Sequence, residues 1–113
     1  MMWHGAYMAT WVFNMNQRQH LSSVDGLQTL LKQQKLLQQF AISRLGVFGS
    51  FARNEPAQDI DLLIEDDVSL ETALQFKQCL EQIIDNPLDV MLKNWANPIV
   101  LHRAMEDIRY VEG

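Results

Sequence analysis

Two aspartates separated by a single residue, Asp59 and Asp61, are the part of this sequence best suited to carry chemistry. Polar and apolar residues alternate around them, which predicts a strand over Asp59–Glu65. Because alternate side chains of a strand point to the same face, both carboxylates are expected close enough together to share a cation. Two such charges repel unless a metal ion or a proton relieves them. An isolated Asp-x-Asp is more often a plain surface feature, so neighbouring residues must decide.

A third acid, Asp89, lies among apolar residues in Leu88–Leu92, a segment whose pattern predicts another strand. An acid in such a strand is unusual unless it faces a cleft or a metal ion. If this strand is the neighbour of the first one, all three carboxylates can converge. Carboxylates are hard oxygen ligands, and where a nucleotide also binds, such ligands favour Mg²⁺. Three acids suit a two-metal displacement, with the ions about 3.5–4 Å apart, one activating a hydroxyl and the other stabilising pyrophosphate.

A candidate phosphate-binding turn precedes these acids in the chain. The apolar segment 42–48 predicts a strand, which ends at Gly49-Ser50 and continues into Phe51-Ala52-Arg53. Glycine lets the backbone approach a phosphate, and the N–H groups at a helix start donate to it. Ser50 adds a hydroxyl, and Arg53 adds a charge able to bind phosphate oxygens. A Gly-Ser turn alone is weak evidence, but together with the three acids it indicates a nucleotide site.

The elements that must position these residues follow from the periodicity of the apolar side chains. Helices are expected at about 24–40, 69–84 and 99–106, and strands at 42–48, 59–65, 88–92 and 108–111. Asn97-Pro98 has the residue types of an N-cap followed by proline in the first turn. The resulting fold class is α/β (α+β), a small mixed sheet flanked by helices.

Some side chains in these elements have simpler structural interpretations. Trp95 is expected to be a packing anchor rather than a platform for a nucleobase. Cys79 is expected to be a small apolar residue on the second helix. The three histidines have no mutual spacing that would suggest a metal site. The core face of the second helix is expected to carry the apolar residues Leu70, Leu74, Leu80 and Ile83.

Composition narrows the class of partner. The chain has 113 residues, enough for one domain, and a formal net charge of −5. Its nine Lys and Arg residues are scattered, which argues against long nucleic acid as a substrate, since phosphate neutralisation supplies most of that affinity. A nucleoside triphosphate or a protein surface is more plausible. The single cysteine permits no internal disulfide and indicates a reducing compartment.

Residues 1–20 are interpreted as an N-terminal extension outside the core, and residues 21–113 as the domain. The apolar stretch 1–13 is too short to span a bilayer and lacks the basic region of a secretory signal. A cytoplasmic protein without a membrane partner is therefore expected. Two interpretations of this stretch stay open: an upstream extension, with Met15 as the true start, or a segment that docks on a partner.

Leu45–Arg53 together with Asp59–Ile64 closely resembles the minimal nucleotidyltransferase family, a branch of the DNA polymerase beta-like superfamily. The likeness extends from about Val24 through the final helix, and it implies the polymerase beta-like fold. By this resemblance, Gly49, Ser50 and Arg53 would hold the triphosphate, and Asp59 and Asp61 would bind two Mg²⁺ ions. Asp89 would be the third metal-binding carboxylate, which in the family helps to position and deprotonate the acceptor hydroxyl.

The resemblance also implies a function and a partner. Many such proteins are antitoxins of HEPN-domain toxins, and some transfer AMP from ATP to a tyrosine of the toxin. We therefore expect Mg²⁺-dependent transfer of a nucleoside monophosphate, AMP from ATP, to a hydroxyl of a partner protein. The chain is too small to hold a separate acceptor-binding domain, so a homo- or hetero-oligomer is also expected.

Two alternatives to this activity remain. The loop Phe51–Gln58 is shorter than the family usually has, and Asn54 and Gln58 replace its usual glycine and serine. These departures favour an antitoxin with an impaired site that neutralises its partner by binding only, whereas the three retained aspartates favour the enzyme. A transferase acting on small molecules would resemble a related branch, but the usual second domain is missing.

Overall fold

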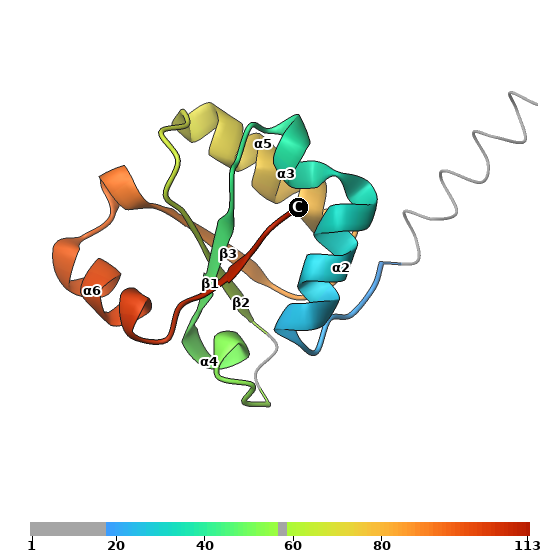
Figure 1. The fold of residues 1–113 in the computed structure, drawn as a ribbon, viewed down its shortest axis with the longest axis horizontal. Coiled ribbons are helices and arrows are strands. Elements are labelled where there is room, and N and C mark those ends of the chain that lie inside the picture. The colour runs from blue at the N-terminus through green and yellow to red at the C-terminus, as the bar shows by residue number, and fades with distance from the viewer. Residues whose placement is uncertain (1–17, 57–58) are drawn as a thin grey trace, which may run out of the picture.

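A four-stranded mixed sheet forms the centre of the fold in the computed structural model, which describes residues 18–56 and 59–113 (Figure 1). Along the chain its strands are β1 (Leu45–Phe48), β2 (Ile60–Ile64), β3 (Leu88–Leu92) and β4 (Arg109–Val111). Their order in the sheet is β3-β2-β1-β4, in which β1 pairs antiparallel with β2 and β4 while β2 pairs parallel with β3. The predicted mixed sheet is confirmed.

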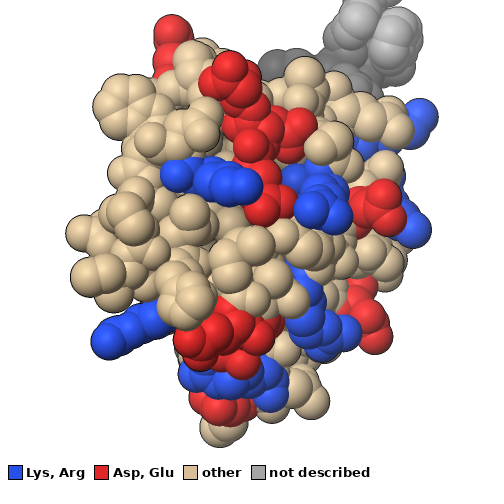
Figure 2. Space-filling model, turned by 60° about the vertical axis from the view of Figure 1, so that its left-hand side comes forward, with Lys and Arg blue, Asp and Glu red and all other residues tan. Residues whose placement is uncertain are grey.

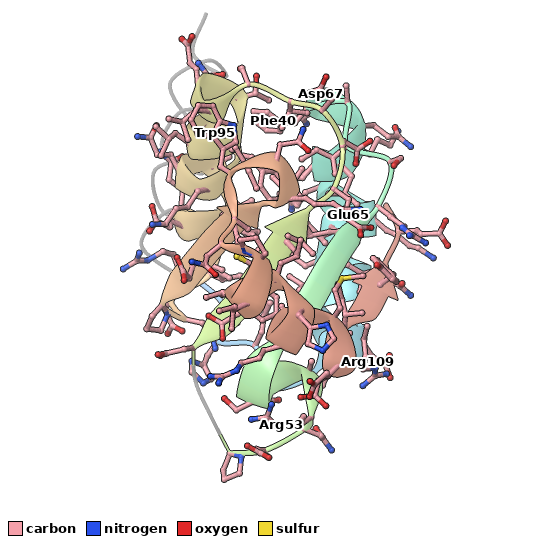
Figure 3. The ribbon with its side chains drawn as sticks, turned by 90° about the vertical axis from the view of Figure 1, so that its left-hand side faces the viewer. Phe40, Arg53, Glu65, Asp67, Trp95 and Arg109 are labelled. Atoms are coloured by element: carbon pink, nitrogen blue, oxygen red, sulfur yellow. The ribbon has the colours of Figure 1, made fainter. Side chains whose placement is uncertain are left out.

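Helices cover both faces of this sheet. One face packs against α2 (Val24–Gln34), α3 (Leu36–Gln39) and α5 (Leu70–Glu81), and α6 (Pro98–Glu106) lies over the other (Figures 1 and 3). The short helix α4 (Gly49–Ala52) follows β1, and the 3₁₀ turn η1 (Lys93–Trp95) follows β3. Because β2 and β3 are parallel, the chain needs a crossover between them, and α5 supplies it.

Strand β2 shows how the sequence sorts its two faces. Ile60, Leu62 and Ile64 are fully buried in the main core beneath the helices, as the alternation predicts. Asp61 and Leu63 leave the opposite face, where Leu63 is also fully buried. On that face Gly46 is the Cα partner of Leu63, and a Cβ on Gly46 would lie 2.5 Å from Ile108 Cδ1. The glycine therefore lets the segment before β4 pack directly on the sheet.

The first helix is not continuous over 24–40 as expected. It breaks at Lys35, which adopts a left-handed conformation with φ of 52° and caps α2 by donating to the carbonyls of Leu31 and Lys32. Leu36 lies five residues after Leu31, a spacing that an unbroken helix would turn away from the core face. The break lets both Leu36 and Leu37 enter the core, where they are 3% and 1% exposed.

The buried face of α5 also differs from the expected one. Leu70 and Leu74 are about half exposed, at 53% and 51%, so their placement in the core was wrong. The core contacts come instead from Ala73, Phe76 and Leu80, which have equally good helical spacing. Phe76 decides the rotation of the helix because its large ring is fully buried and meets Phe40 edge to face at 5.6 Å.

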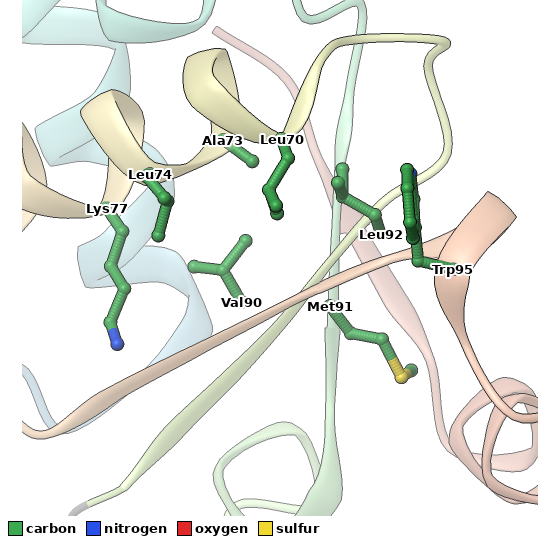
Figure 4. A pocket seen from close by; sticks show the side chains of 8 residues that line it. All are labelled: Leu70, Ala73, Leu74, Lys77, Val90, Met91, Leu92 and Trp95. Carbon is green, nitrogen blue, oxygen red and sulfur yellow. The ribbon is translucent and has the colours of Figure 1, made fainter.

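Trp95 lies on the surface, so the prediction of a packing anchor was also wrong. Its side chain is 74% exposed, because η1 follows the edge strand β3 and, among the described residues, no further strand lies beyond β3 to cover the ring. With the exposed α5 residues and with Val90, Met91 and Leu92 of β3, Trp95 lines an apolar groove of about 280 Å³ (Figure 4).

Two smaller predictions, for Cys79 and for the cap at Asn97, hold. Cys79 lies on α5, partly buried against the core. The N-cap of α6 is Asn97, which accepts from the Ile99 N–H at 2.9 Å, and Pro98 opens the helix. Between residues 18–56 and 59–113, no helix is long and apolar enough to cross a membrane.

Residues 18–20 are attached to the domain, although the expected boundary lies at residue 21. The Arg18 guanidinium donates to the Glu81 carbonyl at 3.1 Å, and His20 pairs with Asp85 at 2.7 Å. The backbone of Gln19 forms a parallel bridge with Ile84. The rest of the expected extension, residues 1–17, lies outside the residues that the structure describes, so the boundary stays a prediction.

Asn86 ties the start of the domain to the turn before β3, and replacing it should be costly. Its side chain is 3% exposed, accepts from the Leu21 N–H at 2.8 Å and donates to the Leu21 carbonyl at 2.9 Å. Asn86→Ala would leave both backbone groups buried without these bonds, so we expect a loss of about 1–3 kcal/mol in the free energy of unfolding. Urea unfolding measures it.

The exposed Asn94 is the matched control, since its side chain makes one long bond of 3.4 Å to Asp67. Asn94→Ala should change the unfolding free energy by less than about 0.5 kcal/mol. Equal urea midpoints for the two variants would contradict the structural role of Asn86.

Candidate active site

Strands β2 and β3 bring Asp61 and Asp89 side by side. The two residues are direct Cα partners in the parallel pairing, so their side chains leave the same face of adjacent strands. Neighbouring strands lie about 4.8 Å apart, a spacing at which both carboxylates can reach one ion. Adjacency of these strands was the condition under which the acids could converge, and it is confirmed.

The charged form of Asp61 is disfavoured at this position. Burial raises the pKa of the Asp61 carboxyl above its usual value, and the negative charges of Asp89 and Asp59 raise it further. A divalent cation would reverse the unfavourable interaction between these carboxylates. The charge distribution and the hard oxygen donors therefore fit Mg²⁺.

Asp59 lies outside the strand pairing that sets Asp61 beside Asp89. It is exposed and lies one residue before β2 begins, so it is next to the strand rather than in it. In the part of the chain that the structure describes, no three acidic, His or Cys side chains are close enough together to hold a metal ion. The fold thus joins Asp61 to Asp89, while Asp59 acts on Asp61 through its charge.

Gly49 lies in close contact with the Asp61 carboxylate. Its φ of 74° is in the left-handed region, and a Cβ built on it would lie 2.5 Å from Asp61 Oδ2. The contact follows from the sheet, because the preceding residue, Phe48, is the Cα partner of Asp61. Only glycine fits both the backbone conformation and the space. The candidate phosphate turn and the candidate metal site are therefore in direct contact.

The loop after this turn folds back on it. The Arg53 N–H donates to the Gly49 carbonyl at 3.2 Å, and the Glu55 N–H donates to the Ser50 carbonyl at 3.1 Å. Asn54 adopts a φ of 61°, a left-handed conformation that asparagine tolerates better than most residues. Asparagine can therefore stand where the family usually has glycine without changing the local backbone. Gln58, the second departure, lies outside the described residues.

Arg53, a predicted phosphate ligand, is bound by two acids. Its Nε donates to Glu55 Oε2 at 2.9 Å, and its Nη1 donates to Asp107 Oδ2 at 2.9 Å. Hydrogen bonds to Glu55 and then Asp107 raise the pKa of Arg53, so it remains a cation. Sequence reasoning missed both acids: Glu55 is only two residues from Arg53 but belongs to no motif, and Asp107 lies 54 residues away.

A second charged cluster lies toward the opposite end of the sheet from Arg53 (Figure 3). Glu65 pairs with Arg44 at 3.3 Å and with Lys93 at 3.9 Å, and it accepts from the Tyr110 hydroxyl at 3.2 Å. Arg44 also stacks over the Tyr110 ring at 3.7 Å. This cluster joins the residue before β1 and the residue after β2 to β4 and η1, and its contacts account for its charges without a ligand.

Charges on the surface are mixed rather than segregated. The face in Figure 2 carries acidic and basic side chains next to one another, without a broad basic area. This distribution agrees with the net charge of −5 and with the inference against long nucleic acid.

Comparison with known proteins establishes the family. The family model described as polymerase beta, nucleotidyltransferase, matches residues 29–110, which include all three candidate aspartates and the Gly49 turn. The chain therefore belongs to the polymerase beta nucleotidyltransferase family. The predicted class of enzyme and the predicted fold are confirmed at this level.

Individual relatives are named for a more specific activity. The Methanocaldococcus jannaschii protein MJ0126, whose name proposes a protein adenylyltransferase, is 28% identical over 98 residues, covering 80% of this chain and all of the relative. The Thermococcus cleftensis protein adenylyltransferase MntA is 25% identical over 95 residues, covering 80% of this chain and 95% of the relative.

Solved structures share the fold at lower identity. A chain of an MntA–HpeT toxin–antitoxin complex has a TM-score of 0.59 and 21% identity, covering 73% of this chain and 70% of that chain. A chain of a toxin–antitoxin structure with AMP-PNP has a TM-score of 0.56 and 20% identity, with coverages of 70% and 68%. A third, from tri-AMPylated Shewanella oneidensis HEPN toxin with MNT antitoxin, has a TM-score of 0.54 and 21% identity, with coverages of 76% and 72%.

Replacing Gly49 by alanine should strain the turn and displace Asp61. A side chain at this φ costs about 1–2 kcal/mol in the free energy of unfolding, and its Cβ would overlap the Asp61 carboxylate. Gly26→Ala in the first turn of α2 is the control: its backbone is not left-handed and the nearest atom to a new Cβ is Ser23 Oγ at 3.3 Å, so it should lose less stability than Gly49→Ala. Urea unfolding measures both variants. A Gly49→Ala variant as stable as wild type would contradict the contact with Asp61.

Neutralising Asp61 should stabilise the metal-free protein. The pKa of Asp61 is higher in the folded chain than in the unfolded chain. The folded state therefore gains stability at a pH below the unfolded pKa, and it loses this stabilisation as the pH rises through the folded pKa. Asp61→Asn should therefore be more stable than wild type at about pH 7 with chelator, and the difference should disappear below about pH 3.9. Urea unfolding at both pH values measures it.

The exposed Asp25 is the control for this charge effect, since it lies in the first turn of α2, where a negative charge is favourable. Asp25→Asn should give no increase in stability at about pH 7. An Asp61→Asn variant less stable than wild type at that pH would refute the proposed repulsion.

Proposed function

We propose that this chain transfers AMP from ATP to a hydroxyl of a partner protein in a Mg²⁺-dependent reaction, and that the partner is a HEPN-domain toxin which it neutralises. The observation that carries the proposal is the contact between the Gly49 turn and Asp61, with Asp89 beside it in register. Relatives named protein adenylyltransferases and fold neighbours in toxin–antitoxin complexes support the nucleotide and the partner.

Each candidate residue has a role in this proposal. Asp59, Asp61 and Asp89 would hold two Mg²⁺ ions, which supply charge stabilisation at the phosphates when bound. Gly49 would let the backbone approach the triphosphate, and the Ser50 hydroxyl would donate to it. Arg53 would bind phosphate oxygens once its present acidic partners release it.

The reaction itself is a displacement at the α-phosphorus of ATP. Asp89 would orient the acceptor hydroxyl and take its proton as the oxygen attacks. A bond forms between this oxygen and the α-phosphorus while the bond from that phosphorus to the bridging oxygen breaks, and pyrophosphate leaves. A partner protein would supply the acceptor hydroxyl.

Neutralisation by binding alone is the second candidate function. The contacts of Arg53 with Glu55 and Asp107 favour it, because a phosphate ligand already bound by acids is not free for a nucleotide. The repelling pair Asp61–Asp89 opposes it, since a protein that only binds gains nothing from two adjacent like charges.

Transfer of label separates the two functions. The protein is incubated with ATP labelled at the α-phosphate, Mg²⁺ and a HEPN-domain toxin taken from a gene adjacent to its own, and label on the toxin is measured. Asp59→Asn and Asp61→Asn should each lower the rate at least about 100-fold, because each removes a metal ligand. The control, Asp25→Asn, should label at the wild-type rate.

Chelation of Mg²⁺ should also abolish labelling. Absence of label with wild-type protein would refute the enzyme, whereas variants that lose label yet still neutralise the toxin would favour binding alone. Since Asp61→Asn is expected to be more stable than wild type, its loss of label could not be ascribed to unfolding.

A further inference from the structure

Glu55 and Asp107 both accept hydrogen bonds from the Arg53 guanidinium, Glu55 at its paired Nε and Nη2 groups and Asp107 at Nη1. Glu55 accepts from Nε at 2.9 Å and from Nη2 at 3.3 Å, and Asp107 accepts from Nη1 at 2.9 Å. A guanidinium recognises phosphate through the same paired N–H groups that here meet Glu55. A phosphate can therefore take the Nε and Nη2 groups only if Glu55 moves away, and it must compete with Asp107 for Nη1.

Glu55 is held beside the candidate phosphate turn by the backbone. Its N–H donates to the Ser50 carbonyl at 3.1 Å, and the Arg53 N–H donates to the Gly49 carbonyl at 3.2 Å. An acid fixed at this position repels a triphosphate as well as competing for Arg53. Its presence opposes nucleotide binding in two ways.

Asp107 stands at a position that disfavours it. It is the C-cap of α6, where the helix dipole is negative and an acid is unfavourable. Within residues 18–56 and 59–113, the ion pair that compensates it is the one with Arg53. This pair also links the end of α6 to the end of α4, which are far apart in sequence.

Both ion pairs are solvent-exposed, which makes an exchange of partners feasible. The side chains of Arg53, Glu55 and Asp107 are 42%, 50% and 39% exposed. Exposed pairs of this kind are weak and are screened by salt, whereas a triphosphate offers several charged oxygens at once.

We propose that Glu55 and Asp107 set the affinity for the nucleotide by competing with its phosphates for Arg53, so that nucleotide binding breaks the contact between α4 and α6. The inference rests on the proposed nucleotide site and adds two affinity-determining residues to it. Neither acid touches the reacting atoms; both act through Arg53.

A double-mutant cycle tests the competition directly. The dissociation constant of Mg²⁺–AMP-PNP is measured by calorimetry, without any acceptor, for wild type, Asp107→Asn, Arg53→Ala and the double variant. Asp107→Asn should bind about 2- to 5-fold more tightly, because an exposed pair no longer has to be broken. Arg53→Ala should bind more weakly, and in its background Asp107→Asn should have no effect. Asp107→Glu should restore wild-type affinity.

Glu106→Gln is the matched control. It removes the same charge from the adjacent residue of α6, but Glu106 pairs with His102 rather than with Arg53. Its affinity should stay within about twofold of wild type, since it changes only the distant field. The gain from Asp107→Asn should shrink as salt is raised.

Several results would overturn the inference. An unchanged or weaker affinity of Asp107→Asn would do so, as would a gain that persists in the Arg53→Ala background, because that gain would be simple charge repulsion. If wild type binds AMP-PNP and Asp107→Asn does not differ, only this inference fails. If wild type and all variants bind no nucleotide, the proposed nucleotide site fails with it.

Discussion

The parallel pairing of β2 with β3 is the constraint on which the rest of the site depends. It sets Asp61 opposite Asp89, so the sheet forces two like charges together. The burial of apolar residues in the same strand offsets the repulsion between these charges. Ile60, Leu62 and Ile64 are fully buried on the other face. The core thus holds in place a polar arrangement that would be unfavourable alone. One face of β2 can be apolar while the other carries the acid, because the side chains of a strand alternate between the two faces.

The antiparallel pairing of β1 with β2 adds the second component. Since Phe48 is opposite Asp61, the residue after the strand must lie against the carboxylate, and glycine is the residue that fits there. The acids and the turn are therefore positioned by backbone pairing rather than by side-chain packing. By contrast, Arg53 is positioned by exposed ion pairs, which give it freedom that the acids lack.

Much of this arrangement was accessible from the sequence, for identifiable reasons. The bounds of β3 and the cap at Asn97 matched because local pattern and turn chemistry decide them. The break at Lys35 and the rotation of α5 could not be predicted, because each depends on which apolar side chains meet in the core. In α5 two stripes had equal periodicity, and only the packing of Phe76 against Phe40 selects one. The contact of Arg53 with Asp107 depends on how distant elements dock, and no local pattern encodes it.

The tie between Asn86 and Leu21 has a consequence for the order of folding. It joins residues 65 apart in sequence, and β1 likewise waits for β4, which ends at Val111. Contacts of such long range form only after large loops have closed, which slows folding relative to a helical protein of the same size. A chain leaving the ribosome cannot place Asp89 beside Asp61 until β3 has emerged, and it cannot complete the sheet until β4 is free. The acids therefore meet only after β1, β2 and α5, which help to hold them, have already been made.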